Sequence, residues 1–192
     1  MKHKVKDIIS GSIAVKTAIL NDELILNQVV EAAEMIKNCL RKGGKLLFCG
    51  NGGSAADAQH LAAEFSGRFY KDRKALPAEA LHVNTSYLTA VANDYSFDVV
   101  YSRLIDGIGH DGDVLVGIST SGNSVNIVNA LEKAKEIGMK TIGLTGDTGG
   151  KMSDHSDILI RIPSSDTPRI QESHIMLGHI ICQLVEETYF GA

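Results

Sequence analysis

The chain has 192 residues, of which 44% are hydrophobic, so one domain with a full core is expected. Its net charge of -4, without a cluster of Lys and Arg, argues against nucleic acid as a partner, so an anionic ligand would need a local site. No segment approaches the roughly 20 apolar residues of a membrane span, and no membrane partner is expected.

The number and spacing of the cysteines indicate the cellular compartment. Cys39, Cys49 and Cys182 are odd in number, widely spaced and form no C-x-x-C pair. This pattern is typical of free thiols in a reducing environment. The first residues, MKHKVKDIIS, also lack the apolar stretch of a secretory signal. We therefore expect a cytoplasmic protein.

Two helices are predicted first, a weaker one over about residues 5–20 and a second over about 24–40. Apolar residues at three- and four-residue steps define the second helix, and Gly43-Gly44 ends it. Short apolar runs then alternate with helical segments. We predict strands at 45–50, 79–83, 113–118, 140–145 and 157–162, and helices at 55–67 with Ser54 as N-cap, 86–93, 124–137 and 167–189.

This alternation predicts an α/β fold with an open, doubly wound, five-stranded parallel sheet. We expect a single domain over 1–192, with N-terminal helices at 1–42 and an α/β core at 43–192 that ends in a long helix. Ligands of such folds bind at the carboxyl ends of the strands. Two loops rich in glycine and serine directly follow predicted strands, so both belong to that edge.

The loop at 119–124 reads Ser-Thr-Ser-Gly-Asn-Ser and contains four hydroxyl groups immediately before a predicted helix. The amide groups at a helix N-terminus favour anions, and hydroxyls add neutral donors. An ordinary N-cap loop needs only one such hydroxyl, so phosphate binding is the preferred interpretation. The loop at 50–54, Gly-Asn-Gly-Gly-Ser, is a weaker signal, either a turn or a place where a sugar approaches the main chain. It matches neither a dinucleotide fingerprint nor a Walker A motif.

Two polar pairs on helices are candidates for chemistry. His60 and Glu64 are four residues apart and share a helix face, where they form either a metal or acid–base pair or an ordinary exposed pair. His179 lies among apolar residues of the last helix and, by itself, fits a core histidine equally well. Gln171 lies eight residues before it, roughly 12 Å along a straight helix. Both side chains could reach one metal only if the helix is distorted near Gly178 or if the site draws on more than one subunit.

The stretch 51–60, Asn-Gly-Gly-Ser-Ala-Ala-Asp-Ala-Gln-His, together with the loop at 119–124, resembles the sugar isomerase (SIS) family. Within it the similarity is strongest to the phosphoheptose isomerases and extends over essentially the whole chain. The resemblance implies a flavodoxin-like sheet, a homotetramer with active sites near subunit interfaces, and one zinc ion per subunit. It implies zinc ligands at His60, Glu64, Gln171 and His179. The substrate-binding positions it implies are Asn51, Gly52, Gly53, Glu64, Asn93, Asp94, Ser119, Thr120, Ser121, Ser124 and Gln171.

The implied reaction is the conversion of D-sedoheptulose 7-phosphate into D-glycero-D-manno-heptose 7-phosphate, which in this family feeds ADP-heptose synthesis for surface glycans such as lipopolysaccharide. We expect Glu64 to act as the base and His179 as the partner acid and base, with an enediol(ate) between ketose and aldose. Two alternatives stay open. One is a non-catalytic adaptor that binds the replication initiator DnaA, although that relative lacks the acidic residue and final histidine present here. The other is an SIS isomerase for another sugar phosphate.

Overall fold

The computed structural model describes residues 1–191 and is built around a five-stranded sheet in which every strand pair is parallel. The strand order is β2-β1-β3-β4-β5, and helices cover both faces, which confirms the predicted doubly wound fold. The strands are β1 (Leu46–Gly50), β2 (Ala78–Ala80), β3 (Val114–Ile118), β4 (Lys140–Thr145) and β5 (Ile158–Arg161).

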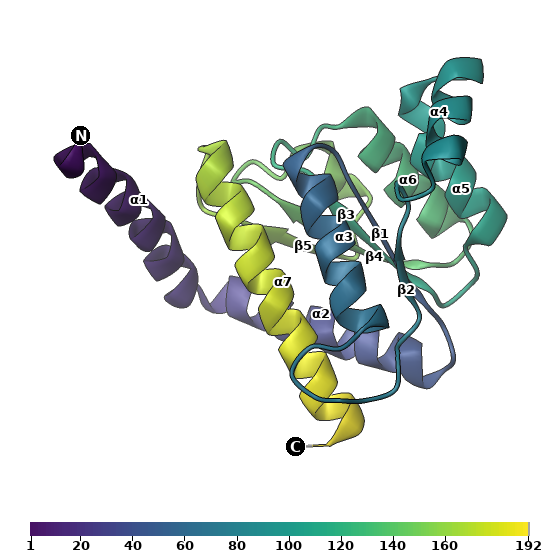
Figure 1. Cartoon of the computed structure of the whole chain (residues 1–192), viewed down its shortest axis with the longest axis horizontal. Coiled ribbons are helices and arrows are strands. Elements are labelled where there is room, and N and C mark those ends of the chain that lie inside the picture. The colour runs from purple at the N-terminus through teal and green to yellow at the C-terminus, as the bar shows by residue number, and fades with distance from the viewer. Residues whose placement is uncertain (192) are drawn as a thin grey trace.

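Helices α1 (Lys2–Leu20) and α2 (Glu23–Arg41) precede the first strand, and the other helices lie between or after the strands (Figure 1). The latter are α3 (Gly53–Ser66), α4 (Thr85–Asp94), α5 (Val100–Ile108), α6 (Val125–Glu136) and α7 (Thr167–Phe190), with short 3₁₀ helices η1 (Phe97–Val99) and η2 (Gly150–Asp154).

Successive residues of the central strands face opposite layers. Leu46 and Phe48 of β1 belong to the core beneath α2, α3 and α7, whereas Leu47 and Cys49 belong to the core beneath α5 and α6. Because both faces are covered, β1 and β3 are fully buried. This explains why these strands read as continuous apolar runs rather than as an alternating pattern. All three cysteines are buried and free.

The winding direction reverses between β1 and β3. The chain passes from β1 to the edge strand β2 on one side, then returns to place β3 on the other side of β1. Gly50 pairs with Ile118, so the loops that follow these two strands start side by side. In open parallel sheets this reversal creates the crevice that accepts ligands.

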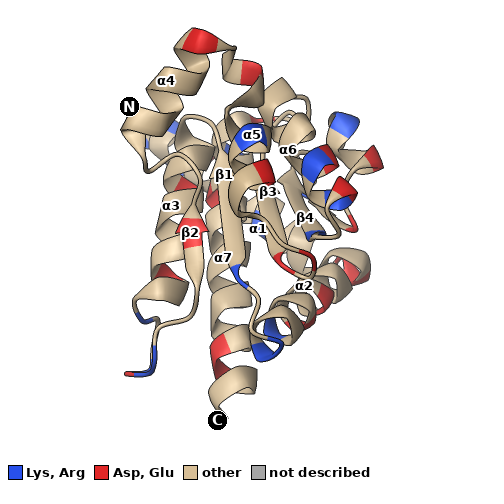
Figure 2. Cartoon of the chain, turned by 90° about the vertical axis from the view of Figure 1, so that its right-hand side faces the viewer, with Lys and Arg blue, Asp and Glu red and all other residues tan. Residues whose placement is uncertain are grey.

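Helix α1 extends away from the rest of the chain (Figure 1). Its apolar side chains Val5, Ile8, Ile9 and Ile13 are exposed. Contacts with the first turns of α7 hold it in place, including a 2.7 Å hydrogen bond that the Ser12 hydroxyl donates to Glu172. Within residues 1–191, no helix is long and apolar enough to cross a membrane. Figure 2 shows basic and acidic positions interspersed along α2 and α6.

Two local predictions were incomplete or wrong. Residues 97–108, which form η1 and α5, were not predicted as helix, although Val100, Tyr101 and Ile105 recur at helical spacing and are buried. The predicted N-cap Ser54 lies inside α3 and is buried, and the N-cap is Gly52. Gly52 has a positive φ of 56°, a conformation that glycine adopts without a steric cost, and the helix begins two residues earlier than expected.

Candidate metal and phosphate site

Helices α3 and α7 lie side by side and run in the same direction. Gly53 of α3 lies next to Gln171 of α7, and further along Leu61 lies next to Gly178. A β-carbon on Gly178 would lie 2.6 Å from the Leu61 side chain, so only glycine allows the helices to approach this closely. This close approach determines the direction in which the side chains beside the Gly178–Leu61 contact are oriented.

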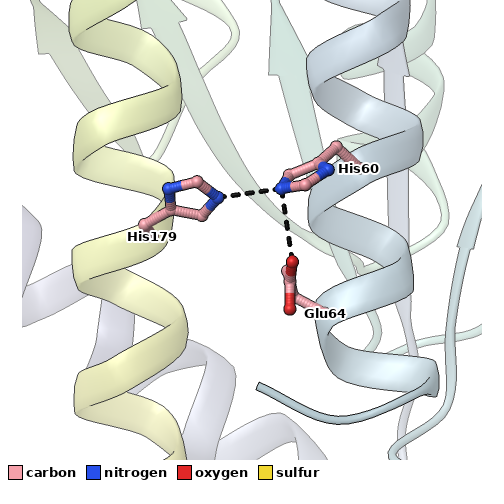
Figure 3. Close-up of side chains that lie close together, drawn as sticks. All are labelled: His60, Glu64 and His179. Atoms are coloured by element: carbon pink, nitrogen blue, oxygen red, sulfur yellow. Dashed lines mark hydrogen bonds and ion pairs between the residues drawn. The ribbon is translucent and has the colours of Figure 1, made fainter. Parts of the chain in front are cut away.

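His60, Glu64 and His179 converge between these two helices, as Figure 3 shows. His60 Nε2 lies 2.9 Å from His179 Nε2 and 3.2 Å from Glu64 Oε1. The His60 side chain is 51% exposed and the Glu64 side chain 20% exposed, so the cluster opens to solvent from the His60 side. His179 of the last helix therefore joins the His60 and Glu64 pair in one group.

The donor set of this group fits a divalent metal. One ligand atom from each side chain lies within 4.8 Å of the other two. Tetrahedral zinc with bonds of 2.0–2.2 Å places its ligands about 3.3 Å apart, close to the separations of His60 from its two neighbours. Two imidazoles and one carboxylate are a ligand set of catalytic zinc sites, in which the fourth position stays open. Two imidazole nitrogens that face each other also need a shared proton or a cation between them.

Gln171 lies apart from this group within one chain. A β-carbon on Gly53 would lie 2.6 Å from the Gln171 amide nitrogen, so the amide rests on the first turn of α3, seven residues before His60. Helix α7 is continuous from Thr167 to Phe190, so the first of the two alternatives, a distortion near Gly178, is wrong. Gly178 serves the contact between the helices instead. The alternative, a site that draws on more than one subunit, stays a prediction.

The loop at 119–124 forms a compact group of hydroxyls at the N-terminus of α6. The Ser119 hydroxyl lies 2.9 Å from that of Ser124 and 3.5 Å from that of Ser121. Ser124 is the N-cap of α6, but its side chain caps no backbone amide. The first amides of α6 and these hydroxyls thus remain available to an anion.

A second glycine loop supports the hydroxyl loop from behind. A β-carbon on Gly122 would lie 2.1 Å from the Gly149 carbonyl oxygen, and the Gly122 carbonyl accepts a 3.0 Å hydrogen bond from the Met152 amide. The Lys151 amide donates to the Asn123 side chain at 3.0 Å. These contacts fix the shape of the loop without using the hydroxyls of Ser119 or Ser124.

A buried histidine holds the strand end beneath this loop. The His174 ring of α7 hydrogen-bonds the Thr145 carbonyl at 3.2 Å, where β4 ends. Burial lowers the pKa of His174 to about 4, although the Thr145 hydrogen bond acts in the opposite direction. His174 is therefore neutral near pH 7 and donates this bond through Nε2–H.

A pair of amides connects the loops that follow β1 and β3. Asn51 donates to Asn126 at 2.8 Å, and Asn126 donates back to Asn51 at 2.9 Å. Asn126 lies in the first turn of α6 and is buried. The sequence analysis did not single out Asn126, because its partner lies 75 residues away.

The predicted positions Asn93 and Asp94 end α4 on another part of the surface. Both are exposed, and the Asn93 amide donates to Asp94 at 2.8 Å. Helix α4 packs against α5 and η1 (Figure 1). No contact among the described residues connects the Asn93 or Asp94 side chain to His60, Glu64 or His179.

Comparison with known proteins identifies the family. A model of the SIS domain matches residues 14–146. The chain is 51% identical to a phosphoheptose isomerase of Clostridium acetobutylicum over 191 residues, which cover all of this chain and 97% of that one. It is 53% identical to a phosphoheptose isomerase of Aneurinibacillus thermoaerophilus, with 99% and 96% covered. The chain belongs to the phosphoheptose isomerase family of SIS domains.

The solved structure of the phosphoheptose isomerase GmhA from Neisseria gonorrhoeae gives the matching fold. Its TM-score with this SIS domain is 0.91 at 44% identity, with 97% of this chain and 98% of that chain covered. The likeness therefore includes α7 and most of α1, which lie wholly or partly outside the segment that the family model matches. It extends the family assignment to α7, which carries His179, and to the N-terminal part of α1.

Proposed function

We propose that this chain is an aldose–ketose isomerase that interconverts D-sedoheptulose 7-phosphate and D-glycero-D-manno-heptose 7-phosphate. The observation that carries the proposal is the convergence of His60, Glu64 and His179 in a chain more than half identical to phosphoheptose isomerases. An adaptor without catalysis would have no need for an acid–base cluster that opens to solvent.

The phosphate of the substrate is assigned to the loop at 119–124. Ser119, Thr120, Ser121 and Ser124 would donate hydroxyl hydrogen bonds to its oxygens, together with the first amides of α6. Neutral donors at a helix N-terminus suit an acidic protein, because they bind an anion without a cluster of basic side chains. Binding energy at the phosphate then positions the carbons that react.

Asn51, Gly52 and Gly53 would orient the sugar hydroxyls at the neighbouring loop. The positive φ of Gly52 and its exposure leave room for close approach of a ligand to the main chain. Gln171, whose amide lies against Gly53, would contact the sugar from the same side. Asn93 and Asp94 are proposed as further substrate contacts, supplied from a neighbouring subunit, because their own subunit holds them apart from the cluster.

Glu64 is the proposed base. Its carboxylate would remove the proton from C1 of the open-chain ketose and return it to C2, with an enediol(ate) between these steps. His179 would donate a proton to the oxygen on C2 and accept one from the oxygen on C1, so that protons balance over the reaction. The partial burial of Glu64 keeps bulk water from competing for the proton.

Zinc is the proposed cofactor, one ion per subunit, held by His60, Glu64 and His179, with Gln171 of a neighbouring subunit as a further ligand. When bound, it would supply Lewis-acid stabilisation of the charge that develops on the substrate oxygens. A group bound to a metal is a poorer base, so Glu64 and His179 would leave the ion or use their second oxygen and nitrogen during turnover. His60 has no other assigned task, and its two short contacts support a role as ligand. We further propose a homotetramer that acts in the cytoplasm.

The first test is direct observation of the reaction. The purified chain is incubated with sedoheptulose 7-phosphate, with and without a chelator, and aldoheptose 7-phosphate is followed by NMR. We expect product that disappears on chelation and returns when zinc is added. Product that survives thorough metal removal would overturn the zinc assignment. No product from folded, zinc-supplied protein would overturn the isomerase, and a DnaA pull-down or other sugar phosphates would then be tested.

A further inference from the structure

An aromatic side chain covers the outer face of His179. Phe69 lies in the loop after α3, and its ring stacks on the His179 ring with centroids 5.7 Å apart and planes inclined by 29°. Tyr70 packs edge-on against Phe69 with centroids 4.5 Å apart. Phe69 and Tyr70 line a surface hollow together with Glu64 and His179. This loop therefore forms a wall of the cluster.

A buried carboxylate organises the backbone of this wall. Glu186 of α7 is 2% exposed and lies seven residues after His179. It accepts hydrogen bonds from three successive amides, those of Phe69 at 3.3 Å, Tyr70 at 2.8 Å and Lys71 at 3.0 Å. Burial alone would raise the pKa of Glu186, but the Lys71 amide, Arg73 and the other amides lower it. The carboxylate is therefore ionised near pH 7.

Arg73 connects the same carboxylate to the end of α3. Its Nε donates to Glu186 Oε1 at 2.9 Å, and both side chains are almost fully buried. The other guanidinium nitrogens donate to the main-chain carbonyls of Glu64 at 2.7 Å and Phe65 at 2.8 Å. Glu64 and His179, which lie on different helices, are thus connected through one buried ion pair.

We propose that Glu186, through Arg73 and the amides of residues 69–71, is a positioning residue that holds Phe69 on the His179 ring and thereby fixes the direction of this imidazole toward His60 and Glu64. The inference rests on the proposed function, since it assigns a task to the support of the same cluster. It goes beyond the ligand set, because neither Glu186 nor Phe69 has a contact with the reacting atoms.

The chemistry favours this role. An imidazole that has only one hydrogen-bonding nitrogen in the cluster can still rotate about its side-chain bonds, and a stacked ring limits that rotation. Partners that orient a metal-binding histidine typically change metal affinity or activity by 10–100-fold when they are removed. A buried ion pair with additional amide donors is a rigid anchor, because each of its polar atoms already has a partner.

Phe69→Leu tests the stack itself. This variant keeps an apolar side chain of similar size but removes the ring. The separate variant Phe69→Tyr keeps the ring. The dissociation constant for zinc is measured by competition with a chromophoric chelator, and kcat and KM for sedoheptulose 7-phosphate are measured with saturating zinc. For Phe69→Leu we expect about 10-fold weaker zinc binding and a lower kcat with a nearly unchanged KM, and for Phe69→Tyr near-normal values.

Glu186→Gln tests the anchor, and Asp72→Asn is the matched control because Asp72 is an exposed carboxylate in the same loop. Glu186→Gln should weaken zinc binding in the same direction when assayed well below its unfolding temperature, and Asp72→Asn should not. Unchanged zinc affinity and kcat in folded Phe69→Leu would overturn the inference while leaving the isomerase intact. A failure of the unaltered chain to bind zinc and turn over substrate would overturn both.

Discussion

Gly178 of α7 lies directly against the side chain of Leu61 on α3, and this contact places His179 opposite His60. Because the residues that touch are sequence neighbours of the two histidines, the separation of the helices sets the separation of the two ring nitrogens. The packing between α3 and α7 therefore also determines the geometry of the cluster.

Gly178→Ala is expected to loosen the cluster. The new β-carbon would lie 2.6 Å from buried Leu61, so the helices must shift, at an overpacking cost of about 1–3 kcal/mol. Alanine gains about 1 kcal/mol of helix propensity, which offsets part of this cost, so the loss of stability should not exceed about 2 kcal/mol. Zinc affinity should fall severalfold. Gly107→Ala on α5, where nothing lies within 4 Å, is the control for both measurements.

Replacing the proposed base separates binding from chemistry. Glu64→Gln keeps the size and one side-chain oxygen but removes the basic group, so kcat should fall about 100-fold or more with substrate still bound. Single-turnover kinetics and substrate titration measure the two effects. Glu31→Gln, at an exposed position of α2, should behave like the unaltered chain. A near-normal kcat in Glu64→Gln would remove Glu64 from the role of base.

The hydroxyl loop is tested by Ser121→Ala. Loss of one hydrogen bond to a charged phosphate costs about 1.5–3 kcal/mol, so KM should rise about 10-fold or more, whereas kcat should change less. Steady-state kinetics measure both constants, and Ser86→Ala on the exposed surface of α4 is the matched serine control. An unchanged KM would argue against the phosphate assignment.

The amide pair between the two loops should show energetic coupling. Asn126→Ala leaves Asn51 without its partner and should destabilise the chain by about 1–3 kcal/mol. In a double-mutant cycle with Asn51→Ala, followed by denaturant unfolding, we expect a coupling energy of about 1 kcal/mol. Additive effects of the two substitutions would mean that the pair contributes no stability of its own.

His174 predicts a loss of stability in mild acid. Burial holds its folded pKa at about 4, below the ordinary value of 6.5, so the unfolded state binds more protons between these values. The stability that neutral His174 contributes to the folded state is complete above pH 6.5 and is lost as pH falls toward 4. The free energy of unfolding changes by roughly 3 kcal/mol over this range. Denaturant unfolding from pH 7 to 4 should show a shallower slope for His174→Gln. An unchanged slope in His174→Gln would contradict this assignment.

Most of the architecture could be predicted because its causes are local in the sequence. Buried strands β1 and β3 are continuous apolar runs, and the glycine and serine residues that follow them mark the loops at the switch point. The segment that forms η1 and α5 was missed even though Val100, Tyr101 and Ile105 carry a helical period. The short strand β2 has only three residues, and its predicted extension to Val83 was too long.

The causes of the site geometry, by contrast, lie between elements. In the sequence, Gly178 suggests a distortion of the helix. Only its contact with Leu61 on α3 shows that it allows the two helices to pack closely. Glu186 reads as a polar residue on the last helix, and its partners in the loop after α3 lie more than 110 residues away. The sequence pattern does not show which distant residues will be in contact. The roles of Gly178 and Glu186 could therefore be recognised only in the folded chain.

The cluster takes one histidine from α3 and the other from the last helix, 119 residues later. During synthesis, His60 and Glu64 leave the ribosome long before His179 has been added. Helix α7 packs on a face of the sheet to which both β1 and β3, a long-range parallel pair, contribute core residues. The ligand set proposed for zinc can therefore be complete only after α7 has been synthesised and has packed beside α3.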